Sequence, residues 1–290
     1  MRTTCDGLME RNFVCIESRI LCRKINYLPF LCSYGMLKKT IRGIAVDKWL
    51  DRIYDKNELT FALIWIGIYC LANSLANSAS AAVGIDSIFT CMVNGILVTY
   101  LYLWIRKKGL LSYFGLCKSR IPASKFLYYL PLALFASTNL WLGFGRNLPV
   151  LDTVCYILSM LCVGFLEEVI FRGFLFKALA KDNVKTAIVI SSITFGIGHI
   201  LNLFNGSGMQ LLDNICQVVG AVACGFLFVL IFHRGSSLLP CIIAHGVNNA
   251  VSVFANEAVM TVQIQLLLSA AILAIVIAYT LVLHRTLPKE

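Results

Sequence analysis

The sequence predicts an all-α protein, a polytopic membrane helix bundle with about eight transmembrane helices. Hydrophobic residues make up 59% of the 290 residues and charged residues only 14%, with a mean hydropathy of +0.79. Soluble domains carry roughly 25% charged residues. The apolar residues form long continuous runs, unlike the alternating pattern of a membrane β-barrel. The basic residues gather between alternate runs, which is typical of membrane topology.

Each apolar run is long enough to cross a bilayer as a helix, although the seventh is short. No internal repeat is visible, which disfavours a transporter built from inverted halves. The expected spans are 59–83, 87–105, 126–144, 151–171, 186–204, 211–232, 237–254 and 260–283.

The distribution of Lys and Arg predicts the orientation of these spans. The N-terminal segment, the C-terminal tail and every second connection together hold 24 of the 25 basic residues, and the other connections hold only Arg146. Basic residues mark the cytoplasmic side, so both termini are expected in the cytoplasm. The net charge of +10 is thereby explained without a nucleic-acid partner, for which no binding motif is present.

The chain is expected to divide into two parts. Residues 1–57 would form a cytoplasmic segment with an interfacial helix near Met36–Tyr54, and residues 58–290 the membrane bundle. Asp6 and Glu10, without a small-residue cleavage site, argue against a signal peptide. Seven of the twelve cysteines fall inside expected spans, and no CxxC pair occurs. We therefore expect reduced cysteines that pack as small apolar residues.

Two adjacent carboxylates, Glu167 and Glu168, interrupt the fourth apolar run. An ionisable residue inside a bilayer costs at least ~2.5–3.5 kcal/mol, so it marks function by default. Arg172 lies four residues after Glu168 and can neutralise it on the same helix face. Glu167 is turned about 100° away and is freer to face the bundle interior. The fourth span runs toward the cytoplasm, so the site is expected to face the cytosolic half.

Two histidines on later spans need polar partners because they lie in apolar helices. His199 shares a helix stripe with Phe195, and His245 shares one with Asn249. Taken singly, each could be a hydrogen-bonded core histidine, and the glutamates could form a structural ion pair. Together, a carboxylate and imidazoles are the minimum set for activating a water molecule, directly or on a metal.

Three motifs in this order resemble the CPBP family of intramembrane proteases. They are EExxxR at Glu167–Arg172, FxxxH at Phe195–His199 and HxxxN at His245–Asn249, within a core at about 150–255. The family includes the type II CAAX prenyl proteases and bacterial Abi-type and bacteriocin-immunity relatives. The resemblance covers about a third of the chain and does not extend to residues 1–120.

The resemblance implies peptide-bond hydrolysis within the membrane. Glu167 would be the general base, with His199 assisting it. His245 and Asn249 would stabilise the oxyanion, and Glu168 and Arg172 would support the site.

A zinc ion, as in a metalloprotease, would have to be held by Glu167, His199 and His245 on three different helices, since no HExxH motif occurs. A metal-free glutamate mechanism is the alternative.

The expected substrate is a membrane-embedded or lipidated peptide or protein, and the expected location is the plasma membrane of a bacterium. Two alternatives stay open at this point. One is a catalytically idle scaffold or immunity protein that binds a membrane partner. The other is a cation-coupled transporter that uses the glutamates, which the modest polarity of the first three spans disfavours.

Overall fold

A computed structural model describes residues 45–122, 124–204 and 209–285. The chain divides into two units, Met1–Lys56 and Asn57–Glu290. In the first unit, α3 spans Ala45–Lys56 and so covers the C-terminal part of the expected interfacial helix. The remainder of that expected helix lies outside the described residues.

The second unit is helical, and no strand occurs within the ranges that the structure describes, so the all-α class is confirmed. Short helical turns η1 (Thr138–Leu140), η3 (His199–Leu203), η4 (Ser252–Phe254) and η5 (Glu257–Val259) extend or connect the longer helices. The helices are α4 (Glu58–Val83), α5 (Ile88–Lys107), α6 (Phe126–Ser137), α7 (Val150–Glu167), η2 (Glu168–Phe176), α8 (Lys177–Leu179), α9 (Val184–Gly198), α10 (Leu211–Gly235), α11 (Leu239–Val251) and α12 (Val262–Arg285).

Six helices in the described ranges are long and apolar enough to cross a membrane. They are α4, α5, the continuous helix Val150–Leu179, α9 with η3, α10 and α12. The fourth expected span therefore runs to Leu179, past residue 171. The third and seventh coincide with the shorter helices α6 and α11. Pro131 interrupts α6 and Pro240 lies in the first turn of α11, where a missing N–H is tolerated.

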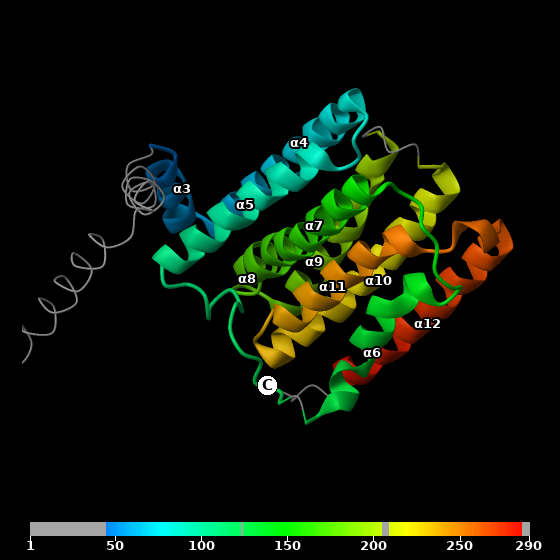
Figure 1. Ribbon diagram of the computed structural model, residues 1–290. Helices are drawn as coiled ribbons and strands as arrows, with labels where there is room; N and C mark the ends of the chain where they lie inside the picture. Colours follow the sequence, from blue (N-terminus) through cyan, green and yellow to red (C-terminus); the bar gives the residue numbers. More distant parts are fainter. Residues whose placement is uncertain (1–44, 123, 205–208, 286–290) are drawn as a thin grey trace, which may run out of the picture. The chain divides into compact units, whose positions relative to one another are not determined.

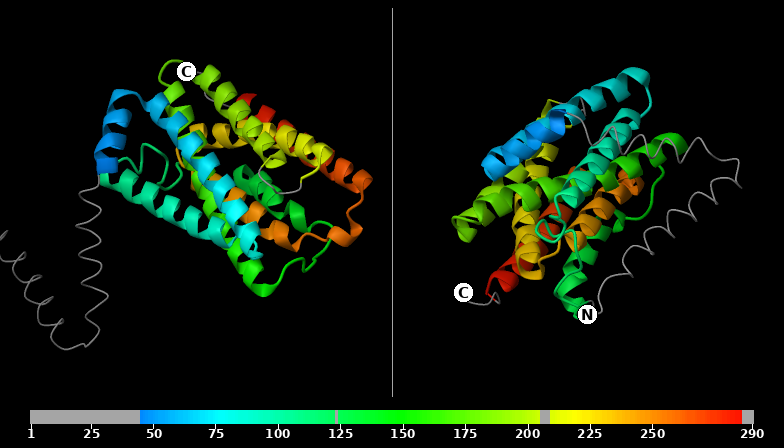
Figure 2. Two further views of the ribbon diagram at one scale, coloured as in Figure 1. Left: turned by 90° about the horizontal axis from the view of Figure 1, so that it is seen from above. Right: turned by 90° about the vertical axis from the view of Figure 1, so that its left-hand side faces the viewer.

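Four central helices, α7, α9, α10 and α11, lie between the α4–α5 pair and the α6–α12 pair (Figure 1). Within the centre α7 packs on α11 and α9 packs on α10. The α4–α5 pair is joined by a tight turn, seen in cyan in both views of Figure 2. Gly84 takes the left-handed conformation there with φ of 73°, which glycine adopts without strain.

Contacts between connections identify one end of this unit, which we call the basic end. Glu58, at the start of α4, pairs with Lys181 at 2.8 Å and accepts a hydrogen bond from Tyr113 at 3.3 Å. The Arg120 N–H donates to the Gly235 carbonyl at 2.9 Å. The second, fourth and sixth connections of the bundle, counted from α4, therefore meet at one end.

The first, third and seventh connections meet at the opposite end. The Asp86 N–H donates to Asp152 at 2.6 Å, which joins the α4–α5 turn to the start of α7. The Gly145 N–H donates to Phe254 at 2.8 Å. The connections rich in basic residues and those poor in them therefore lie at opposite ends of the bundle. One correction applies: Arg172, which the tally placed in a connection, is fully buried within η2.

Candidate active site

A close crossing of α7 and α11 positions the first motif beside the third. A Cβ atom added at Gly164 would lie 2.6 Å from the Cα of Gly246, well inside van der Waals contact. The approach requires glycine at position 164, because any side chain there would collide with the Gly246 backbone. The crossing brings His245, one residue before Gly246, against the carboxylates that end α7.

Glu168 and Arg172 form the fully buried ion pair that the sequence predicts. The Arg172 Nη1 atom lies 3.1 Å from the Glu168 Oε1 atom, and both side chains have no exposed surface. The guanidinium carbon also lies 4.0 Å from the centre of the Phe195 ring. The motif phenylalanine thus covers the charge with its π face, an arrangement that stabilises a desolvated cation.

His245 lies between the two carboxylates. Its Nδ1 atom is 2.9 Å from the Glu168 Oε1 atom, and its Nε2 atom is 3.5 Å from the Glu167 Oε2 atom. A carboxylate only accepts hydrogen bonds, so we assign Nδ1 as the donor to Glu168. The imidazole therefore connects the buried ion pair to Glu167, and both of its nitrogens face carboxylate oxygens.

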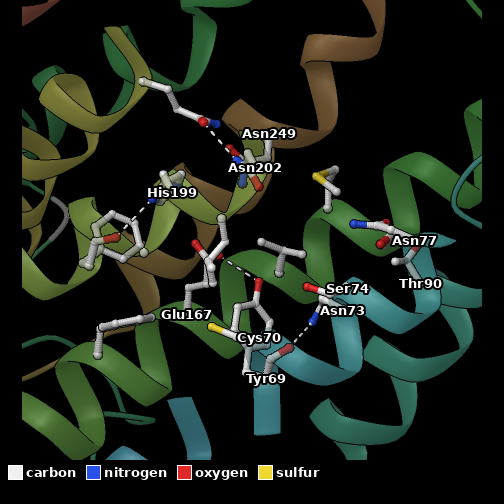
Figure 3. Close-up of a pocket in the computed structure, with 18 of the residues that line it drawn as sticks. Tyr69, Cys70, Asn73, Ser74, Asn77, Thr90, Glu167, His199, Asn202 and Asn249 are labelled. Atoms are coloured by element: carbon white, nitrogen blue, oxygen red, sulfur yellow. Dashed lines mark hydrogen bonds between the residues drawn. The ribbon is translucent and has the colours of Figure 1, made fainter. Parts of the chain in front are cut away.

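Tyr69 is a site residue that sequence reasoning missed. Its hydroxyl donates to the Glu167 Oε1 atom at 2.8 Å, across 98 residues of sequence (Figure 3). The second oxygen, Oε2, makes no hydrogen bond among the described residues. The signal in the sequence was the stripe Phe61, Trp65, Tyr69 on α4, which carries one hydroxyl into a buried face.

His199 presents one ring nitrogen to the interior. Its Nδ1 atom lies 3.1 Å from the Phe195 carbonyl oxygen, which can only accept, so Nδ1 is the donor. In the neutral imidazole, Nε2 then carries the lone pair. Asn214 of α10 donates to the His199 carbonyl at 2.8 Å and fixes the turn at which α9 continues into η3.

A polar cavity of about 380 Å³ joins three of the predicted residues: Glu167, His199 and Asn249 all line it. Its other walls carry mostly hydroxyl and amide side chains, and Figure 3 shows them projecting from several helices. They include Asn73, Ser74, Asn77, Thr90, Tyr156, Ser159, Asn202, Gln217 and Ser252.

A second, largely apolar cavity of about 480 Å³ reaches the same residues from the other side. His199, His245 and Asn249 line one part of it, and apolar side chains of α10 and α12 such as Val219 and Leu273 line the rest. His245 borders this cavity but not the polar one, although its Nε2 atom lies 3.5 Å from the Glu167 Oε2 atom.

The three residues expected to hold zinc do not gather into one ligand group in the part of the chain that the structure describes. No three His, Cys, Asp or Glu side chains within residues 45–122, 124–204 and 209–285 form a group that could hold a metal ion. Both nitrogens of His245 face carboxylates, and the Nδ1 atom of His199 faces a carbonyl. With Nδ1 as the donor in both histidines, Nε2 is the ring nitrogen that carries the lone pair.

The helix changes its winding where the motif begins. Residues Glu168–Phe176 form a π-helix, and all nine side chains are buried. Such segments are rare and are frequent at functional sites, because the wider turn redirects side chains. Nothing in the residue pattern predicted it.

Residues 149–251 match the family model of Rce1-like, type II CAAX prenyl endopeptidases. The segment belongs to the CPBP family. The recognition made from the three motifs is confirmed, since all of them lie inside the matched residues. No curated protein and no solved structure matches the chain significantly. The CPBP segment runs from α7 through α11, and α4 with Tyr69 lies outside it.

Proposed function

We propose that the chain is an intramembrane endopeptidase that hydrolyses a peptide bond of a membrane-associated or lipidated substrate. The observation that carries the proposal is the shared cavity: Glu167, His199 and Asn249 line one polar space inside an apolar bundle. The family match of residues 149–251 supports a protease of the CAAX type. The apolar cavity beside the site offers room for a membrane-soluble part of the substrate.

Glu167 is the general base in this mechanism. Its Oε2 atom accepts a proton from a water molecule, and the resulting hydroxide attacks the scissile carbonyl carbon. The lone pair on the Nε2 atom of His199 accepts the water's second hydrogen and orients it. The Asn249 amide donates to the oxyanion of the tetrahedral intermediate. Glu167 then passes its proton to the leaving nitrogen as the C–N bond breaks, which gives one carboxylic acid and one amine.

His245 takes a positioning role in this proposal, which differs from the oxyanion role that the family resemblance implies. Its ring is held by Glu168 at 2.9 Å and lies 3.5 Å from Glu167. It fixes the base at the edge of the cavity. Glu168 and Arg172 anchor the imidazole in turn.

The test is cleavage of a membrane peptide by purified protein in detergent. Glu167→Gln and His199→Ala should lower the rate by roughly 100-fold or more, the usual contribution of general-base catalysis, while both variants still insert. Glu58→Gln is the matched control, because Glu58 is a carboxylate far from the cavity that pairs with Lys181. Undiminished cleavage by both site variants would refute the proposal. A cellular phenotype that survives Glu167→Gln would favour a partner-binding scaffold.

A further inference from the structure

The C-terminal ends of α6 and α11 lie together beside Asn249. The helix α6 ends at Ser137 and continues into the turn η1, and α11 ends at Val251. The last carbonyl groups of an α-helix have no partner within the helix and must find one elsewhere. Because α6 packs on α11, each helix can supply that partner to the other (Figure 1).

Asn248 of α11 caps the end of α6. Its Nδ2 atom donates to the Phe135 carbonyl oxygen at 2.7 Å and to the Thr138 Oγ1 atom at 2.9 Å. The Thr138 hydroxyl donates its own hydrogen to the same carbonyl at 3.0 Å, so its oxygen is left to accept the bond from Asn248. Since a carbonyl oxygen only accepts, these contacts require the amide nitrogen of Asn248 to point at α6.

Asn139 of η1 caps α11 in return. Its Nδ2 atom donates to the Asn248 carbonyl oxygen at 2.8 Å. That carbonyl lies in the last turn of α11, where the Ser252 N–H donates to the Asn249 carbonyl. Both the side chain and the carbonyl of Asn248 are therefore held by residues 135–139.

The residue held in this way is the direct neighbour of the proposed oxyanion donor. Asn249 lines both cavities, and Asn248 borders the apolar one. Successive side chains on a helix project about 100° apart, so fixing the rotation of the turn at one fixes the direction of the other. An oxyanion donor is effective only when it is held where the negative charge develops. Residues 135–139 precede the matched residues 149–251, so this support comes from outside the CPBP segment.

We propose that Asn248 is a positioning residue, which directs the Asn249 amide at the oxyanion through the reciprocal caps between α11 and α6. The inference rests on the proposed function for the role of Asn249. It makes α6 and η1 part of the scaffold of the active site, in addition to the helices that carry the three motifs.

Steady-state cleavage of a membrane peptide by the purified chain tests this role. Asn248→Ala removes the cap on α6, and Asn139→Ala removes the cap on α11. Each should lower kcat roughly ten-fold or more and change KM less than about two-fold, because an oxyanion donor acts in the transition state.

Asn147→Ala is the matched control. Asn147 also donates to two backbone carbonyls just after α11, those of Val253 at 3.1 Å and Ala255 at 2.9 Å, but it lines neither cavity. Its kcat should stay within about two-fold of that of the natural protein. An equal loss of kcat in Asn248→Ala and Asn147→Ala would overturn the proposal.

A double-mutant cycle separates positioning from general support of the fold. If Asn248 acts through Asn249, Asn248→Ala should lower kcat less than about two-fold further in a chain that already carries Asn249→Ala. The same loss in both backgrounds would contradict the positioning role.

Backbone amide hydrogen exchange at residues 246–251 tests the caps without catalysis. Asn248→Ala and Asn139→Ala should both raise the exchange rate roughly five-fold or more, with and without Glu167→Gln, because local opening of the last turn becomes easier. Unchanged exchange would refute the caps. Cleavage that survives Glu167→Gln would instead refute the protease assignment, so the two failures are distinguished.

Discussion

Glu167 and Glu168 are neighbours in the chain but have different surroundings. Glu168 is fully buried, with Arg172 at 3.1 Å and His245 at 2.9 Å. Glu167 keeps 12% of its side chain exposed and borders the polar cavity. Removing one partner of a buried ion pair typically costs about 3–5 kcal/mol, because the other charge is left without compensation. These different surroundings agree with the proposed mechanism, in which Glu168 anchors the site and Glu167 is the general base.

The hydrogen bond from Tyr69 is the residue-scale contact with the clearest consequence for rate. Tyr69→Phe removes only the hydroxyl that holds the Glu167 Oε1 atom at 2.8 Å. A hydrogen bond to a charged group is worth about 1.5–3 kcal/mol. We expect kcat to fall roughly ten-fold, at the lower end of that range, with KM changed less than two-fold, measured in steady-state peptide cleavage.

Tyr156→Phe is the control for this experiment. Tyr156 lines the same cavity, but its hydroxyl bonds to Ser252 at 2.8 Å instead of to Glu167. If both variants lowered kcat to the same extent, Tyr69 would have no particular role in positioning the base.

At the scale of helices, the site depends on how closely α7 and α11 approach. Gly164 and Gly246 face each other at the crossing, and the third motif lies directly beside the first because of it. The second close contact among the central helices is between α10 and α9. A Cβ atom added at Gly225 of α10 would lie 2.8 Å from the Cα atom of Ser192 of α9. Small residues at such contacts are typical of membrane helix pairs, which associate by close packing.

Gly164→Ala should separate α7 from α11. The added methyl group would lie 2.6 Å from the Gly246 Cα atom, and overpacking of this kind costs about 1–3 kcal/mol. We expect a lower unfolding temperature in detergent together with a loss of most cleavage, since His245 would move away from Glu167.

Gly67→Ala is the matched control on α4, because a Cβ there meets no atom within 4 Å. It should leave the unfolding temperature unchanged or slightly raised, as alanine favours helix over glycine. Equal stability and equal activity of the two variants would show that the close crossing does not support the site.

At the scale of the whole molecule, the sequence and the structure agree on what hydrophobicity and helical spacing determine. Continuous apolar runs predicted the helices, and the four-residue spacing predicted the pairing of Glu168 with Arg172. Three motifs on successive helices predicted that Glu167, His199 and Asn249 would meet. Properties that depend on tertiary packing could not be predicted from the sequence. In the sequence, Tyr69 is one aromatic residue in an apolar stripe and does not stand out as a site residue. The π-helical winding after Glu167 has no characteristic residue pattern.

The ends of the short helices were missed for a related reason. An apolar run gives the length of a hydrophobic stretch but not where the helix stops, so residues 141–144 were counted with the third span although the helical turns end at Leu140.

The central claim of this account is that a carboxylate activates the water without a metal ion. Its most direct test is the initial rate of membrane-peptide cleavage by purified protein before and after exhaustive treatment with a zinc chelator. Because Glu167, His199 and His245 form no metal-ligand group among the described residues, we predict an unchanged rate for the natural protein and loss of cleavage in Glu167→Gln under both conditions. A rate that disappears with the chelator and returns when zinc is added would contradict the claim.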